Sequence, residues 1–262
     1  MKSAVLRILE RLGLLGRAYR AYERSRTFRA KRLERGPDGL PVPPPELIIR
    51  VAGTPDPDWF LEGGVLAEQS IRAALGRAGT RVEDVGAVLD FGCGCGRVTR
   101  RWLELTGPVY GNDLNAEAID WCNSNLSFAR FRRNELEPPL PFADGELGLV
   151  YALSVLTHLA VETQLRWMDE IHRTLRPGGY ALVTVHGDAY LPRLDPDEAG
   201  RFARGDCVVR WSEVAGTNLC TTFHPERFVR ERLARGFEIV EVVPRGALGN
   251  PEQDLVLLRK PR

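Results

Sequence analysis

The 262-residue chain lacks the features that mark extracellular, membrane-embedded or metal-binding proteins. No apolar run approaches the roughly 18 residues that a membrane-spanning helix needs. The five cysteines form neither a CxxC pair nor a Cys/His metal-ligand spacing, so we expect reduced thiols and no metal. No signal-peptide pattern is present, which predicts a cytoplasmic protein. Lysine is scarce, with only three among 36 basic residues, a bias typical of GC-rich bacterial coding.

Net charge is also nearly absent, at +1, although the charges are unevenly distributed. Residues 1–36 hold eleven basic and three acidic side chains, whereas the rest of the chain is mildly acidic. A near-neutral chain has no overall signature for binding a polyanion, so we expect no nucleic-acid substrate. With 44% hydrophobic residues the chain can bury a core, and its length predicts one α/β domain with additions.

The basic first segment, residues 1–35, has the periodicity of a helical arm. Its apolar positions are spaced three and four residues apart, at Val5, Ile8, Leu12, Leu15, Tyr19 and Tyr22. Three roles remain open for this arm. It could pack on its own domain or on a second copy of the chain, lie on a membrane surface, or dock a partner protein or acidic substrate. The proline-rich residues 36–58 predict an extended linker or strap.

Short apolar runs alternate with amphipathic stretches through residues 59–262. Helices are expected between the strands, including a strongly amphipathic one at 162–175 and another at 98–105. This order predicts a Rossmann-like, doubly wound and mostly parallel seven-stranded sheet with helices on both faces. The seven strands are expected at residues 85–91, 109–111, 129–133, 149–153, 180–185, 237–243 and 255–258.

A long insert, residues 187–224, separates the fifth strand from the next helix. Residues 207–211 and 218–223 within it have the pattern of a hairpin. Connections of this length inside a compact domain are usually functional. Together with residues 36–60, we interpret the insert as a substrate lid.

The first expected strand ends in the motif DFGCGCGR, residues 90–97. Its glycines, Gly92, Gly94 and Gly96, permit positive φ angles and the close approach of a ligand to the backbone. A dinucleotide fingerprint requires Gly-x-Gly-x-x-Gly, but Arg97 occupies the position of its third glycine. The motif therefore argues against NAD, FAD and pyrophosphate binding in general.

A carboxylate follows the second expected strand, because Asp113 lies 23 residues after Asp90. A carboxylate at this position can accept hydrogen bonds from both hydroxyls of a ribose. The expected ligand therefore contains a ribose but no diphosphate.

These segments resemble, in order and spacing, the motifs of class I S-adenosylmethionine-dependent methyltransferases. The resemblance includes residues 141–142 before the fourth strand and the sequence LRPGG at 175–179, and it covers residues 59–262. Residues 151–159 are similar to the fourth-strand segment of small-molecule methyltransferases. Many family members have an aspartate at the position of Gly148, which we interpret as a structural difference.

The resemblance implies that S-adenosylmethionine is the cofactor, and it implies a role for each motif residue. The three glycines of the motif would line the methionine portion of the cofactor, and Asp90 would lie beside its amino group. The remaining contacts that the resemblance implies are Asp113 with the ribose, Leu114 beside the adenine, and Asn134 or Glu135 at the adenine amino group.

Methyl transfer from a sulfonium is an in-line displacement, in which the protein mainly supplies alignment and desolvation. An oxygen acceptor also requires a general base. The four histidines are few enough to consider singly. We expect His172 to be a solvated helix residue, whereas the candidate bases are His158 after the fourth strand, His186 after the fifth, and His224. The residues of the insert that could contact a polar acceptor are Arg210, Trp211 and Asn218.

The sequence thus predicts methyl transfer to a small-molecule acceptor, most readily a hydroxyl of a sugar-containing or natural-product compound. The acceptor class rests on the family resemblance alone. The alternatives are an N-methyltransferase and a non-catalytic S-adenosylmethionine-binding scaffold that docks through the arm. A nucleic-acid acceptor is disfavoured because the body is acidic and the Asn/Asp-Pro-Pro-Tyr/Phe motif is missing.

Overall fold

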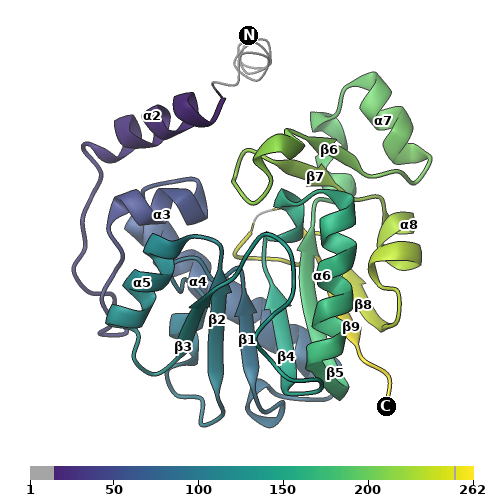
Figure 1. Ribbon diagram of the computed structural model, residues 1–262, viewed down its shortest axis with the longest axis horizontal. Helices are drawn as coiled ribbons and strands as arrows, with labels where there is room; N and C mark the ends of the chain where they lie inside the picture. Colours follow the sequence, from purple (N-terminus) through teal and green to yellow (C-terminus); the bar gives the residue numbers. More distant parts are fainter. Residues whose placement is uncertain (1–14, 251) are drawn as a thin grey trace.

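The computed structural model describes residues 15–250 and 252–262 and has a seven-stranded sheet at its centre (Figure 1). The strand order is β3-β2-β1-β4-β5-β9-β8, with β1 to β5 parallel and β9 antiparallel to both of its neighbours. The predicted Rossmann-like sheet is therefore confirmed. The strands are β1 (Val88–Phe91), β2 (Val109–Asp113), β3 (Arg130–Arg133), β4 (Leu147–Ala152), β5 (Leu175–Val185), β8 (Glu238–Val243) and β9 (Asp254–Arg259).

Helices cover both faces of the sheet, and each face has its own buried cluster. Because successive strand residues point to opposite faces, Val88 packs against α4 and α5 while Leu89 packs against α6 and α8. The predicted amphipathic helix is α6, which buries Trp167, Met168 and Ile171. The helices are α4 (Pro57–Arg77), α5 (Ala116–Asn125), α6 (Val161–Thr174) and α8 (Glu226–Phe228), the last continued by a π-helical turn over Val229–Leu233.

The prediction of a helix at residues 98–105 is wrong in helix type and length, because a short 3₁₀ helix over Thr99–Trp102 forms there. Three of its side chains are held by distant groups. The Thr99 hydroxyl donates to Asp90, the Arg100 guanidinium forms an ion pair with Asp38, and the Trp102 indole donates to the Tyr151 hydroxyl. These tertiary contacts tighten the segment beyond what its local pattern indicates.

The proline-rich segment is less extended than expected, because it contains the helix α3 (Pro45–Ala52). Pro45 occupies the first helical turn, where its missing N–H costs nothing, and Ile48 and Ile49 are buried. Part of the predicted arm forms α2 (Leu15–Thr27), which lies beside α3 (Figure 1). The seam positions Val5, Ile8 and Leu12 fall outside the described residues.

The insert contains the predicted hairpin, in which β6 (Val208–Arg210) and β7 (Thr221–Phe223) pair antiparallel. The helix α7 (Pro196–Ala203) precedes it and begins with a capping box formed by Asp195 and Glu198. Figure 1 shows the hairpin and α7 beyond the ends of the central strands.

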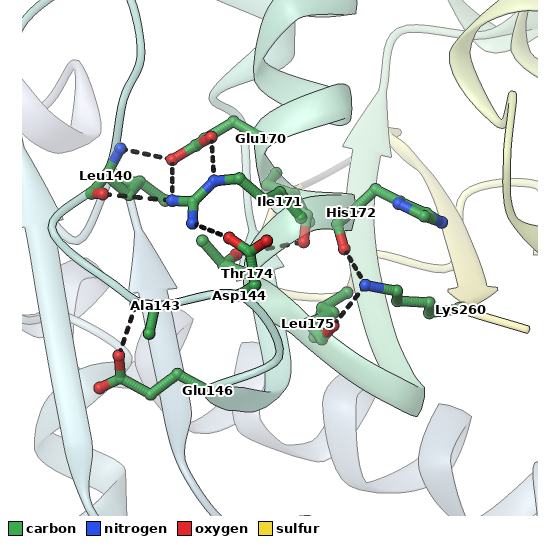
Figure 2. Close-up of polar contacts among 11 residues, drawn as sticks. Leu140, Ala143, Asp144, Glu146, Glu170, Ile171, His172, Thr174, Leu175 and Lys260 are labelled. Atoms are coloured by element: carbon green, nitrogen blue, oxygen red, sulfur yellow. Dashed lines mark hydrogen bonds and ion pairs between the residues drawn. The ribbon is translucent and has the colours of Figure 1, made fainter. Parts of the chain in front are cut away.

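Figure 2 shows how the end of α6 is held. The Arg173 guanidinium forms ion pairs with Glu170 and Asp144, and Glu170 also accepts a 2.6 Å hydrogen bond from the Leu140 N–H. The Lys260 ammonium donates to the main-chain oxygens of His172, in the last turn of α6, and of Leu175, just past it, which satisfies carbonyls that the helix leaves unpaired. These contacts tie α6 to the connection between β3 and β4 and to the end of the chain.

No helix within the described ranges is long and apolar enough to cross a membrane. The described residues also contain no cluster of three or more acidic, histidine or cysteine side chains suited to a metal ion. All five cysteines are free.

Candidate active site

A cavity of about 450 Å³ opens where the central strands end. Ligands of open α/β sheets bind at this edge, beyond the carboxyl ends of the strands. The loops after β1, β2, β3 and β4 form one wall, while α2, α3 and the insert form the other. The predicted site residues that line the cavity are Asp90, Gly92, Asp113, Leu114, Asn134, Glu135, His158 and Asn218.

The glycine motif forms a tight turn in which Gly92, Gly94 and Gly96 all have positive φ, at 79°, 52° and 74°. Only Gly92 lines the cavity, and a Cβ there would lie 2.2 Å from a methyl carbon of Val155. A Cβ on Gly94 would meet Val51 of α3. A side chain is therefore excluded at Gly92 on the cavity side of the turn, and at Gly94 where α3 packs against the turn.

Asp90 is a buried carboxyl in the floor of the cavity. It accepts a 2.6 Å hydrogen bond from the Thr99 hydroxyl and a second from the Tyr151 hydroxyl. Burial raises the pKa of Asp90 to about 6, although both hydrogen bonds act in the opposite direction. A ligand cation beside Asp90 would favour its ionised form, which suits the amino group of a methionine.

Two backbone donors orient the Asp113 carboxylate. The Gly94 N–H and the Asn115 N–H each donate to one of its oxygens at 2.8 Å. Burial raises the pKa of Asp113, and the backbone hydrogen bonds oppose that shift. The carboxylate retains lone pairs for further donors, such as the two hydroxyls of a ribose.

An unpaired acceptor lies next to the expected adenine position. The Asn134 side-chain N–H donates to the Glu135 carbonyl at 2.7 Å, whereas its Oδ1 is buried with no partner in the described part of the chain. Buried polar atoms of this kind normally have a partner. Asn134 lines the cavity together with the apolar Leu114 and Leu136. An amino group on a flat ring held between these leucines would satisfy Asn134 Oδ1, so the residues present fit an adenine.

His158 is the histidine that lines this cavity. Its Nδ1 lies 2.7 Å from the Cys220 carbonyl oxygen, so Nδ1 carries the proton and donates it. Nε2 is then the basic nitrogen, and no described residue forms a hydrogen bond with it. Burial lowers the pKa of His158 below its usual value of 6.5, so the ring is neutral at pH 7.

The other two candidate bases lie outside the cavity. His186 hydrogen-bonds the Thr222 carbonyl and packs 4.1 Å from the ring of Tyr190, and burial lowers its pKa to about 3. His224 is fully buried with Nε2 2.9 Å from the side-chain oxygen of Gln164, and its pKa is also about 3. Both histidines are therefore neutral side chains that pack in the interior of the protein.

Of the three predicted substrate residues, one lines the cavity and two do not. Arg210 forms an ion pair with Glu198, and Trp211 begins the next turn with a φ of 55°. Neither residue lines the cavity. Asn218 does, and its side-chain N–H donates to the Arg50 carbonyl at 2.6 Å. The insert therefore reaches the cavity through the loop between β6 and β7.

Several lining residues were not predicted. Tyr19 and Glu23 come from α2, so the described part of the arm forms part of the cavity wall. The side chains of Tyr19 and Asn218 are in hydrogen-bond contact, which joins the arm to the insert. Arg97 also lines the cavity, and its place directly after the glycine motif was a signal for it.

Comparison with known proteins agrees with this geometry. Residues 89–183 match the family model described as methyltransferase domain. A solved S-adenosylmethionine-dependent methyltransferase from Methanosarcina mazei shares the fold, with a TM-score of 0.50 and 22% identity over 67% of this chain and 92% of that one. Residues 89–183 are thus similar to a methyltransferase domain, and the fold of the chain is that of solved S-adenosylmethionine-dependent methyltransferases.

Curated relatives differ in what they methylate. An uncharacterized methyltransferase of Synechocystis sp. is 36% identical over 101 residues, covering 38% of this chain and 47% of the relative. A malonyl-[acyl-carrier protein] O-methyltransferase of Pectobacterium atrosepticum is 27% identical, covering 54% and 50%. A tRNA N(3)-cytidine methyltransferase of Gallus gallus is 27% identical, covering 46% and 34%. The chain spans about half the length or less of these relatives, and the expected exclusion of nucleic acid finds no support among them.

Proposed function

We propose that this chain transfers the methyl group of S-adenosylmethionine to an oxygen of a small-molecule acceptor, with His158 as the general base. The observation that carries the proposal is the state of that histidine. Its Nδ1–H is committed to the Cys220 carbonyl, and burial lowers its pKa, so a neutral ring presents Nε2 as a proton acceptor. An oxygen nucleophile needs such a base to lose its proton as the methyl group arrives.

The cofactor supplies an electrophilic methyl on a positively charged sulfur, and the chain supplies binding and alignment. Asp113 would bind the ribose hydroxyls, Asn134 the adenine amino group, and Asp90 the methionine amino group. Each of these groups lines the cavity with hydrogen-bonding capacity to spare. Residues that clamp both reactants gain rate by fixing their mutual orientation.

The arm and the insert serve as the cover of the site. Tyr19 of α2 and Asn218 of the insert are in contact and both line the cavity. A cover of this kind excludes water from the reacting methyl group and from the base. This extends the lid predicted at residues 187–224 to include the described part of the arm.

The direct test measures acceptor-dependent release of S-adenosylhomocysteine by wild type, His158→Gln and His172→Gln. His172 is the matched control because it lies half-buried against Phe237 and does not line the cavity. With a hydroxyl acceptor, we expect His158→Gln to lower kcat by about 100-fold or more, within the range for general-base catalysis. The dissociation constant for S-adenosylhomocysteine should change little. Full activity of His158→Gln on a hydroxyl acceptor would contradict the assignment.

An amine acceptor, the N-methyltransferase alternative, makes a different prediction for the same variant. A neutral amine attacks without prior removal of a proton, so His158→Gln would retain most of the rate. No acceptor-dependent release with any compound, despite tight binding of S-adenosylhomocysteine, would favour the non-catalytic scaffold.

A nucleic-acid acceptor is the second candidate, and one feature of α2 favours it. Arg17, Arg24 and Arg26 are exposed, and no described carboxylate forms an ion pair with them. Phe28 next to them is 84% exposed. Arginines beside an exposed ring suit phosphates and bases. If tRNA is the acceptor, methylation of bulk tRNA should fall steeply between 50 and 200 mM salt, on the order of 10³-fold for six phosphate contacts.

A further inference from the structure

A buried hydrogen-bond network holds the turn that follows β4. Ser154 lines the active-site cavity there, and its φ of 60° is unusual for a residue other than glycine. Its main-chain N–H donates to Thr184 Oγ1 at 2.7 Å. The Gln253 amide nitrogen donates to Ser154 Oγ at 2.8 Å, and the Thr184 hydroxyl donates to Gln253 Oε1 at 2.7 Å. Because Thr184 and Gln253 are both buried, the network fixes Ser154 in this strained conformation.

His186 decides which end of the Gln253 amide faces Ser154. Its Nδ1 lies 3.1 Å from the Thr222 carbonyl oxygen, which can only accept a hydrogen bond, so Nδ1 carries the proton of the neutral ring. Nε2 is therefore a bare acceptor, and it lies 3.4 Å from the Gln253 amide nitrogen. The amide oxygen in that place would leave two buried acceptors facing each other, which is unfavourable. The amide must present its nitrogen to both His186 and Ser154.

The network leaves the hydroxyl proton of Ser154 available to the cavity. Ser154 Oγ accepts from Gln253, so its own proton points elsewhere. Among the described residues this hydroxyl also contacts Thr157 Oγ1, at 3.3 Å, which is longer than the usual O–H···O distance of about 2.7–2.8 Å. Ser154 therefore offers a donor to a ligand. In the same short segment, His158 offers the acceptor Nε2.

We propose that His186 and Gln253 are positioning residues, which aim the Ser154 hydroxyl at a second oxygen of the methyl acceptor. The acceptor then carries two neighbouring oxygens. One is the hydroxyl that gives its proton to His158, and the other is a hydroxyl, carbonyl or ether oxygen that accepts a hydrogen bond from Ser154. The inference rests on the proposed function, because it concerns the acceptor of that reaction.

This network depends on parts of the chain beyond the shared methyltransferase domain. Thr222 belongs to the insert and Gln253 precedes β9, and both lie outside residues 89–183. His186, which the sequence predicts as a candidate base, instead acts through Gln253 and Ser154. The preference for an acceptor with two oxygens is therefore a property of this chain's own additions.

Cyclohexanol and its vicinal diol, cis-cyclohexanediol, form a matched pair of probes, because the diol adds one oxygen beside the first hydroxyl. Ligand-observed NMR measures their dissociation constants on protein saturated with S-adenosylhomocysteine, for wild type, Ser154→Ala, Gln253→Glu and Gln164→Glu. Gln164→Glu is the control, since Gln164 is also buried and bonds a histidine, His224, but does not line the cavity. Thermal unfolding shows whether each variant is folded, and wild type with Ser154→Ala suffices if the glutamate variants are not.

Wild type should bind the diol about tenfold more tightly than cyclohexanol, a factor within the range for one neutral hydrogen bond. Ser154→Ala should bind both probes equally. Gln253→Glu should also lose the preference although Ser154 is present, because a carboxyl oxygen in place of the amide nitrogen accepts the Ser154 proton and withdraws it from the cavity. Gln164→Glu should keep the preference. A network that only stabilised the fold would not produce this selectivity.

The NMR spectrum of the histidine ring nitrogens tests the network without any acceptor. At pH 7 the His186 signals, assigned by their loss in His186→Phe, should show a protonated Nδ1 and a bare Nε2. A protonated Nε2 would refute the positioning role, and so would a wild type that binds both probes equally or binds neither. If no hydroxyl compound causes release of S-adenosylhomocysteine while the preference for the diol is intact, the proposed function is overturned and the Ser154 donor stands.

Discussion

Ionisation of Asp90 should be coupled to cofactor binding. In the free protein the pKa of Asp90 is about 6, because burial outweighs the hydrogen bonds from Thr99 and Tyr151. A ligand ammonium beside this carboxyl would lower its pKa well below 5. Binding at pH 6 should therefore release about half a proton, and the affinity for S-adenosylhomocysteine should be about tenfold weaker at pH 5 than at pH 7.

Calorimetric titration at pH 6 in two buffers with different ionisation enthalpies measures the proton release directly. His158→Gln is a control, because His158 also lines the cavity and can titrate in acid, and this variant should still release the half proton. Asp90→Asn should abolish the release and flatten the pH dependence. An affinity that does not change between pH 5 and 7, or full proton release from Asp90→Asn, would refute the placement of the amino group.

The same carboxyl affects the stability of the free protein. The folded pKa of about 6 exceeds the ordinary value of 3.8, so folding favours the protonated form. The contribution of Asp90 to stability is fully present below pH 3.8 and is lost as the pH rises through 6, by about 3 kcal/mol. S-adenosylhomocysteine should therefore raise the Tm by more at pH 7 than at pH 5.

Three further predictions concern single positions. Gly148→Ala should lower the free energy of unfolding in urea by about 2–3 kcal/mol or prevent folding, because its Cβ would lie 1.6 Å from the Val85 carbonyl oxygen; the control Gly76→Ala meets nothing within 4 Å and should be neutral or stabilising. Asp113→Asn should weaken binding of S-adenosylhomocysteine by about 30-fold in calorimetry, and wild-type affinity would contradict the ribose contact. The rate of O-methylation should be level above pH 6.5 and fall only in more acid solution, because the pKa of His158 is lowered; a rise in rate centred above pH 7.5 would exclude it as the base.

The sheet was predictable because its signals are local. Each buried strand is a short apolar run, and the motif at residues 90–97 combines one such run with the glycines of a ligand-binding turn. The reason for a glycine at position 148, in the neighbouring strand β4, lies in a tertiary contact. The sequence marks it as a departure from the family, and the Val85 carbonyl above it shows that no side chain, aspartate included, fits there.

The misjudged elements depend on distant partners. Thr99, Arg100 and Trp102 have ordinary helical spacing, yet each binds a group outside this segment, so local periodicity is a poor guide there. The different positions of the three candidate histidines also depend on tertiary packing. All three candidates lie near the ends of strands, and only the packing of the insert brings His158 to the cavity while enclosing His186 and His224.

The arm connects these observations with the open question of the acceptor. Because Tyr19 and Glu23 line the cavity, deletion of residues 1–35 would remove part of the site as well as any docking surface. Loss of activity in such a deletion would therefore not distinguish a small molecule from a nucleic acid. Reversing the charge of Arg24 and Arg26 leaves the cavity wall in place, because both side chains are exposed and neither lines it. Only a polyanionic acceptor should then lose affinity, and a small acceptor should be turned over as before.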